Sequence, residues 1–420
     1  MENAGVSGPE TDVSKKGRLG KSTGRKRSCA TITAMRFRWG LAVLWVGVLC
    51  VFSPVFGQSS GADGAKRLVL IDQDGSGPGG SNQMAMLALL EARNVRVLGI
   101  TMVTGNAWRE EEVAHTLRML ELTGHSDVPV ARGAVFPLVR TEDETRLEAP
   151  VMGGVNWLGA WGGGPTTLLA GSEDGKHVVG AKAANSVILP PAHGPFVVPA
   201  MAEGAPTLRP IDEDGVHFMI REVHEHPHEV TIFAGGPLTD IALAVRIDPE
   251  FAGLTKGLVV MGGSLNPQTD DPEFSESPRH EFNFWFDPEA AHIALGAEWP
   301  RIDVTTVDVS IQVMFTEAML KQIAQAQTPA ARYIAAWSAE RYYMWDELAA
   351  CAWLDPTLIT REKFVRMDVE MDHGPEYGNT LTWSEALKPK MAERRVHAQL
   401  GVDVERFDRM FVGLMAGTKR

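Results

Sequence analysis

Short apolar runs alternate with longer helical segments along most of the chain, and this alternation constrains the fold more than any other feature. Residues 68–71 form a continuous apolar run, which is typical of a strand buried on both faces of a sheet. A helix is predicted over 81–93, a strand over 95–101, and a second helix over 107–122 that ends at Gly124. Strands and helices of these lengths predict an α/β fold, with a mostly parallel central sheet and helices on both faces.

The alternation is interrupted over residues 139–214, which are rich in Gly and Pro. We interpret this stretch as a lid over a site, because long irregular segments inside a compact domain are usually functional. Beyond it the alternation resumes, and no linker divides residues 67–416, which predicts a single domain. The later elements are expected as helices near 216–225, 240–247, 316–353 and 404–415, and as strands at 230–234, 257–261, 302–307 and 365–369.

The first 57 residues have the composition of a leader segment. A basic stretch rich in Ser and Thr precedes an apolar run at 40–52, and small residues then lead to Gly57. This order predicts a signal peptide cleaved near Gly57, and therefore an exported protein, periplasmic or extracellular. The apolar run is short for a membrane span, so a retained N-terminal anchor is kept only as the alternative. Met35 is an alternative start, and residues 58–66 form a Gly/Ser/Ala linker.

The charge of the chain narrows the classes of partner. Residues 1–57 hold nine of the 40 Lys and Arg and three of the 53 Asp and Glu, so the remainder carries a net charge of −19. A chain this acidic is not expected to bind nucleic acid or anionic membranes, since both need basic patches. We also expect no stable membrane insertion of the mature chain. A homo-oligomer is compatible with the sequence. Only Cys351 follows the leader, which excludes an internal disulfide in the mature chain.

Acidic residues stand where a parallel α/β sheet binds its ligands. Asp72 and Asp74 follow the first strand, and Gly235 follows the strand predicted at 230–234. Ligands of such sheets bind beyond the carboxyl ends of the strands, so these residues are expected at one edge. Asp346 lies in an otherwise apolar helix, where an acid needs a partner. A hard cation ringed by oxygen ligands would serve several such acids together.

Several motifs resemble those of one enzyme family. The segment LVLIDQDGSGPGGSNQMAMLALL, followed by VLGITMVTGN, resembles the D-T-D-P-G-x-D-D and V-x-G-N signature of the inosine–uridine nucleoside hydrolases. Similar segments follow in the family's order over about residues 67–416, namely TIFAGGPLTDIALAVRIDPE, LVVMGG, HEFNFWFDPEAA and WDELAACAWLDP. The resemblance implies an N-glycosidase that splits ribonucleosides into free base and ribose, using a water molecule activated by Ca²⁺.

The resemblance also implies a role for each matching residue. Asp74 matches the acid that binds Ca²⁺ and takes the proton from the attacking water. Asp346 matches a second Ca²⁺ carboxylate, and the carbonyl group of Gly235 matches a backbone ligand. The residues that match the family's contacts to the ribose hydroxyls are Asn106, Glu281 and Asn283, with Asp72 as a supporting acid.

Ser81 and Asn82 replace the family's adjacent acid pair, after a longer glycine loop. Ser81 can bond a ribose hydroxyl, and Asn82 can offer its amide oxygen to Ca²⁺, but without charge. Because Ca²⁺ affinity depends on the number of charged ligands, we expect weaker binding than in the family. In the alternative interpretation, the longer loop brings another group into the site. Ser81 and Asn106 could also serve only as helix caps.

Two histidines common in the family are absent, since Met152 and Trp345 stand in their places. In several relatives these histidines help to protonate the leaving base. The Trp345-Asp346 pair instead resembles the purine-preferring branch of the family, in which the base stacks between tryptophans. The resemblance therefore implies a preference for purine nucleosides, with Trp345 as one wall of the base site. Trp157 or Trp161 in the predicted lid is a hypothesis for the other wall.

Two other functions stay open at this point. The altered acid pair touches the ribose contacts, which leaves a hydrolase of another N-riboside or related glycoside as an alternative. The same change allows a non-catalytic protein that binds a ribosyl compound. Retention of the carboxylates that match the base and the second metal ligand argues for an enzyme.

Three further features receive structural interpretations. His224, His226 and His228 flank Pro227 and are interpreted as a solvated turn, with a metal site as the alternative. Cys351 is expected in the core. The loop at 75–80 lacks the Lys-Ser/Thr ending of a P-loop, which argues against a nucleoside triphosphate site.

Overall fold

The computed structural model describes residues 66–155, 157–162, 193–338, 342–390 and 394–418. The predicted leader, the linker before Lys66 and residues 163–192 of the predicted lid lie outside this set. Within the described part of the chain, no helix is long and apolar enough to cross a membrane.

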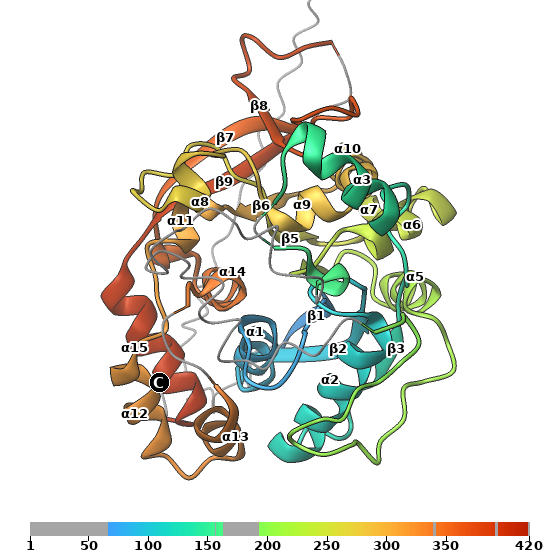
Figure 1. The fold of residues 1–420 in the computed structure, drawn as a ribbon. Helices are drawn as coiled ribbons and strands as arrows, with labels where there is room; N and C mark the ends of the chain where they lie inside the picture. The colour runs from blue at the N-terminus through green and yellow to red at the C-terminus, as the bar shows by residue number, and fades with distance from the viewer. Residues whose placement is uncertain (1–65, 156, 163–192, 339–341, 391–393, 419–420) are drawn as a thin grey trace, which may run out of the picture. The chain divides into compact units, whose positions relative to one another are not determined.

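The described strands form one sheet in the order β3-β2-β1-β4-β5-β6-β9-β7-β8 (Figure 1). Neighbours from β3 through β9 pair in parallel, whereas β7 runs antiparallel to both β9 and β8. The strands are β1 (Arg67–Gln73), β2 (Val95–Met102), β3 (Val130–Arg132), β4 (Val230–Ala234), β5 (Gly257–Met261), β6 (Ile302–Thr305), β7 (Ile359–Val369), β8 (Thr380–Trp383) and β9 (Arg394–Val402).

Two cores cover the two faces of the sheet, as the apolar run in β1 predicts. Val69 and Ile71 pack into one core, while Leu68 and Leu70 pack into the other, because successive side chains of a strand point to opposite faces. Helices α1, α2 and α12 to α15 contribute to the first core, and α5, α6 and α10 to the second. The predicted α/β fold with helices on both faces is therefore confirmed.

The helices largely follow the expected positions. Gly124 ends α2 in a left-handed conformation (φ 85°), and its amide group bonds back to Leu120, as its place in the sequence predicts. The region expected as one helical stretch over 316–353 is instead three helices. The described helices are α1 (Ser81–Leu90), α2 (Arg109–Thr123), α3 (Glu142–Met152), α5 (Gly215–Glu225), α6 (Thr239–Ile247), α7 (Phe251–Leu254), α8 (Pro272–Ser275), α9 (Phe282–Phe286), α10 (Pro288–Gly296), α11 (Val307–Ser310), α12 (Glu317–Ala324), α13 (Pro329–Trp337), α14 (Trp345–Leu354) and α15 (Val404–Met415), with short 3-10 helices η1 (Gly159–Trp161) and η3 (Pro356–Leu358).

The described parts of the predicted lid contain ordered structure. Helix α3 and η1 lie in its first part, and residues 193–209 contact α2. There Glu121 accepts hydrogen bonds from the backbone amides of Thr207 and Leu208 at 2.6 and 2.7 Å. Hydrogen bonds from α2 thus fix this segment to the first half of the fold.

Candidate active site

The carboxyl ends of β1, β2 and β4 bring the predicted acids to one edge of the sheet. Asp72 is in register with Thr101 of β2 and Ala234 of β4, so the residues that follow these strands are neighbours. Asp74, two residues further along, is fully buried. The backbone amide of Asn106 donates to Asp74 Oδ2 at 3.0 Å, which holds that carboxyl group in one orientation.

Helices α1 and α14 begin at the same edge and pack side by side, although they are far apart in the sequence (Figure 1). Asn82, in the first turn of α1, places its amide nitrogen 2.7 Å from Asp74 Oδ1 and 2.7 Å from Gln73 Oε1. The same nitrogen lies 3.3 Å from the carbonyl oxygen of Gly235. Three oxygen atoms that could serve a cation therefore surround one amide group.

Asp346, in the first turn of α14, faces this cluster. Its Oδ1 atom is buried and has no hydrogen-bond partner among the described residues. Burial, with the charge of Glu281, raises the pKa of Asp346 to about 8, while the nearby hydroxyl group of Ser81 and amide group of Gln73 act in the opposite direction. Burial and the charge of Asp346 also raise the pKa of Asp74 well above its usual value. Two buried carboxyl groups that disfavour each other's ionisation are typical of a cation site.

Glycine is required where β4 ends. A Cβ atom on Gly235 would lie 2.1 Å from Gln73 Nε2 and 2.6 Å from Asp346 Oδ1, far inside van der Waals contact. Only the missing side chain lets the Gly235 backbone approach both groups. The carbonyl oxygen of Gly235 is thereby held beside the carboxylates, where the sequence predicts a ligand oxygen.

Two of the predicted sugar contacts, Glu281 and Asn283, lie at the start of α9. Glu281 caps α9 by accepting from the amides of Asn283 and Phe284 at 2.9 and 3.0 Å, which fixes the first turn of that helix. Asn283 Nδ2 lies 3.0 Å from the carbonyl of Met261 and 3.4 Å from that of Gly235. Burial raises the pKa of Glu281. The cap therefore positions both polar side chains from one short helix.

Asn106 and Trp157 form a hydrogen-bonded pair beside the acids. Trp157 Nε1 donates to Asn106 Oδ1 at 2.7 Å, and Asn106 Nδ2 lies 3.4 Å from Asn82 Oδ1. Trp161, the other candidate for a wall of the base site, is only 2 % exposed and stacks on Phe286 at 4.4 Å. Trp161 is thus a core residue, and Trp157 is the tryptophan of the predicted lid that reaches the site.

The helix-cap interpretation of Ser81 and Asn106 is wrong. Gly80 is the N-cap residue of α1, and Trp108 is that of α2; neither supplies a side-chain cap. Ser81 Oγ instead donates to Glu347 Oε2 at 2.5 Å and accepts from the backbone amide of Asp346 at 3.2 Å.

Asp72 lies just behind the cluster, as a supporting acid would. Thr101 Oγ1 donates to Asp72 Oδ1 at 2.6 Å. Burial, and then the charge of Asp240, raises the pKa of Asp72 well above its usual value. Asp240 in turn accepts from the amide of Ala134 at 2.7 Å, and burial raises its pKa to about 7. Asp72 therefore belongs to a buried carboxyl pair with Asp240 rather than to the cation cluster itself.

Trp345 begins α14, directly before Asp346. Its partly buried ring meets Phe274 of α8 and Tyr343 edge to face, with ring centroids 5.6 and 5.2 Å away. This aromatic group lies next to the acid cluster along the chain, at the start of the helix that carries Asp346.

Gln73 and Glu347, which no sequence motif singled out, are both fully buried at the site. Gln73 stands between Asp72 and Asp74, and Glu347 follows Asp346 in an apolar helix. The available signal was an unexplained polar residue next to a predicted ligand. Burial raises the pKa of Glu347 to about 8, and its hydrogen bonds from Ser81 and Tyr342 act in the opposite direction.

A cavity of about 330 Å³ is lined by residues of α3, α8 and α9, and the carboxylates of the cluster are not in its wall. Met152 of α3, His280 and Trp285 contribute to its wall, and the last two flank Glu281 and Asn283 in the sequence. Arg140, also in the wall, lies between the rings of Trp285 and Tyr377 at 4.7 and 4.3 Å. The position that matches a family histidine thus opens on this cavity.

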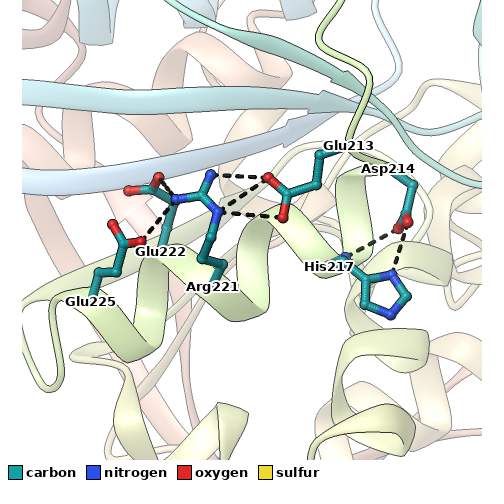
Figure 2. Close-up of polar contacts among 6 residues, drawn as sticks. All are labelled: Glu213, Asp214, His217, Arg221, Glu222 and Glu225. Carbon is teal, nitrogen blue, oxygen red and sulfur yellow. Dashed lines mark hydrogen bonds and ion pairs between the residues drawn. The ribbon is translucent and has the colours of Figure 1, made fainter.

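The three histidines around Pro227 do not form one metal site among the described residues. His226 alone groups with acids, namely Glu222 and Glu225, at ligand spacing. Figure 2 shows that Arg221 already pairs with both acids, at 2.7 and 3.2 Å. His224 pairs with Asp248 at 2.6 Å and is largely exposed. Solvated ion pairs at the end of α5 account for this segment.

Comparison with known proteins finds one family. The family described as "Inosine-uridine preferring nucleoside hydrolase" matches residues 69–409. A "Probable uridine nucleosidase 1" of Oryza sativa subsp. japonica is 30% identical over 268 residues, which are 63% of this chain and 66% of that protein. An "Inosine-uridine preferring nucleoside hydrolase" of Leishmania major is 26% identical over 349 residues, or 80% and 94% of the two chains. The match to the plant protein spans just under two thirds of its length.

Solved structures agree on the fold. A plant nucleoside hydrolase, PpNRh1, superposes with a TM-score of 0.61 at 24% identity, over 83% of this chain and 99% of that one. A purine-preferring ribonucleoside hydrolase from Gardnerella vaginalis gives 0.61 at 23% identity, over 84% and 98%. At this identity the similarity supports the α/β architecture alone.

Proposed function

Because the chain belongs to the inosine–uridine preferring nucleoside hydrolase family, we propose that it is a Ca²⁺-dependent, purine-preferring ribonucleoside hydrolase that releases free base and ribose. Membership confirms the predicted family and class of enzyme. The preference for purines and the identity of the metal are our proposals. Relatives described as uridine nucleosidases favour the opposite preference, so the test must compare both kinds of substrate.

The donor set fits a hard divalent cation. Asp74 and Asp346 supply carboxylate oxygens, and Gly235 supplies a carbonyl oxygen. Asn82 would add its amide oxygen after a half-turn of its side-chain amide group. The unpartnered, buried Oδ1 atom of Asp346 is the observation that carries this proposal, because such an atom needs a compensating positive group. Bound there, Ca²⁺ would lower the pKa of a water molecule and orient it.

Asp74 is proposed as the general base. It must be ionised to accept a proton, and a neighbouring cation favours the ionised form that burial disfavours. The hydrogen bond from the Asn106 amide fixes one carboxylate oxygen of Asp74, and the position of the other oxygen is therefore defined as well. Asn283 and Glu281, held by the cap of α9, would grip the sugar hydroxyls while positive charge develops on the ring.

Trp345 is proposed as the residue that selects purines. It stands next to Asp346, and hence close to the sugar–base bond. No histidine occupies either of the family's two positions for protonating the base. A purine offers a large π face for stacking and a basic nitrogen remote from the sugar, whereas uracil offers neither.

The test is kcat/KM for inosine and uridine with added Ca²⁺, in the wild-type protein, Trp345→Ala and Trp353→Ala. Trp353 is a matched control because it lies at the other end of α14, with Arg67 over its ring at 3.7 Å. We expect inosine to be preferred, and the preference to fall by about 2- to 13-fold in Trp345→Ala only, as for a stack of roughly 0.5–1.5 kcal/mol. Equal rates on both substrates in the wild-type protein would reject purine selection, and an unchanged preference in Trp345→Ala would leave that residue a core aromatic.

A further inference from the structure

We infer that Glu347 is a positioning residue for the sugar, and that it acts through the hydroxyl group of Ser81. This inference rests on the proposed function, because the sugar is that of the same nucleoside. Both carboxyl oxygens of the buried Glu347 already accept hydrogen bonds, from Ser81 and Tyr342, whereas Ser81 is partly exposed at the start of α1. The two side chains meet where α1 packs on α14.

Among the described residues, the hydrogen bonds of Ser81 leave one of its two acceptor sites open. A hydroxyl group has one proton and two lone pairs. The proton of Ser81 is directed to Glu347 Oε2 at 2.5 Å, and one lone pair accepts from the amide of Asp346 at 3.2 Å. The remaining lone pair is available to a sugar hydroxyl, and the carboxyl group behind the Ser81 proton makes that oxygen a stronger acceptor.

Glu347 is itself held from the other side. Tyr342 donates its hydroxyl proton to Glu347 Oε1 at 3.0 Å, so each carboxyl oxygen receives one O–H donor. The first turn of α1 contains no acid, so α14 provides the carboxyl group at this place. These contacts identify Ser81 and Glu347 as one unit built from two helices.

The chief competing explanation is that Glu347 only stabilises the packing of α1 on α14. Loss of such a structural contact would lower the free energy of unfolding but would not change substrate binding. Asp287 provides a matched control, because it is equally buried and accepts from the hydroxyl group of Thr239 at 2.7 Å. Among the described residues, Asp287 accepts hydrogen bonds from Leu138, Thr239 and Ala290, none of which belongs to the acid cluster. Asp287→Asn should therefore lower the melting temperature with KM unchanged.

The experiment compares kcat and KM for inosine in the Ca²⁺-loaded wild-type protein, Glu347→Gln, Ser81→Ala and the double variant. We expect each single change to lower kcat/KM about tenfold, chiefly through KM, as for the loss of one hydrogen bond to the sugar. The double variant should be no worse than Ser81→Ala, since Glu347 acts through that hydroxyl. Losses that multiply to about a hundredfold would overturn the inference, as would an unchanged KM in Glu347→Gln.

Moving the carboxyl group from position 347 to position 81 gives a second, independent readout. Ser81→Asp in the wild-type chain places a second carboxyl group next to that of Glu347, and the two repel each other, so ribose binding measured by calorimetry should weaken. The same change in the Glu347→Gln background should restore it, and failure to restore it would count against the inference. If the wild-type protein releases no base from any nucleoside, the proposed function fails, whereas the calorimetry with ribose still tests Glu347.

Discussion

The protonated form of His115 is expected to stabilise the fold, and this stabilisation is expected to disappear at alkaline pH. His115 lies on α2 and is only 5% exposed. Burial by itself lowers its pKa, but hydrogen bonds and charge from Glu111 and Glu203 outweigh burial and raise the pKa to about 9. His115 Nδ1 bonds directly to Glu203, and Nε2 lies 3.7 Å from Glu111. Residues 193–209, which carry Glu203, are thereby held to α2.

The size and sign of the effect follow from this shift. The ordinary value is 6.5, so the change to about 9 corresponds to about 3 kcal/mol at roughly 1.4 kcal/mol per pKa unit. When folding raises the pKa of a group, the stabilisation is complete at a pH below the pKa of the unfolded state. It disappears as the pH rises through the pKa of the folded state. The free energy of unfolding should therefore fall by about 3 kcal/mol between pH 6.5 and 9.5 through this residue. Other titratable groups near the pair include His193, 2.9 Å from Glu111, and Arg118, which bonds to the Glu203 carbonyl.

The assay is chemical denaturation of wild-type protein and His115→Gln at several pH values from 6 to 10. The difference between the two should be largest near pH 6 and shrink toward pH 9.5. His217→Gln is the control, because its pair with Asp214 at 2.8 Å is exposed on α5 (Figure 2) and exposed pairs contribute little. Parallel curves for wild-type and His115→Gln over the whole range would refute the reasoning.

Three further predictions concern the site and the leader. Asp74→Asn should fold normally and lose on the order of 10² to 10⁴ in turnover, because it keeps an oxygen but not the base; unchanged turnover would reject Asp74 as the base. Asn82→Asp should tighten Ca²⁺ binding in calorimetry, since affinity rises with ligand charge. No gain, or a loss, would show that Asn82 is not a ligand. Mature protein should begin near Gln58 and be found outside the cytoplasm, and N-terminal sequencing that returned Met1 or Met35 would contradict export.

The edge of the sheet that holds the acids could be predicted because it depends on local pattern. A continuous apolar run gives β1, and the rule that ligands bind beyond parallel strands then places Asp74 and Gly235 together. By contrast, β7 begins with exposed residues, and β9 lies between β6 and β7. Strand β7 pairs with β8 and β9, which both follow it in the sequence, and no local pattern indicates which strands will pair. The sequence therefore predicted only a strand starting near residue 365.

The partner of Ser81 was not predictable for a related reason. Glu347 is 266 residues away along the chain, and only the packing of α1 on α14 brings the two together. The sequence also allowed a helix cap, because Ser is a good cap and precedes an apolar helix. The structure places Ser81 one residue inside the helix, which frees its hydroxyl group for Glu347. A tertiary contact therefore determined which of two chemically reasonable roles the hydroxyl takes.

Asn82 also has an electrostatic effect on stability. Several carboxyl groups with raised pKa already lie at this edge of the sheet, among them Asp74, Glu281, Asp346 and Glu347. An aspartate at position 82 would add another negative group in hydrogen-bond range of Asp74, whereas the amide of Asn82 donates to that carboxylate at 2.7 Å. Charge that attracts a cation also repels neighbouring acids. Asn82→Asp should therefore lower the free energy of unfolding measured in a chelator while it tightens Ca²⁺ binding, because both changes have one electrostatic origin.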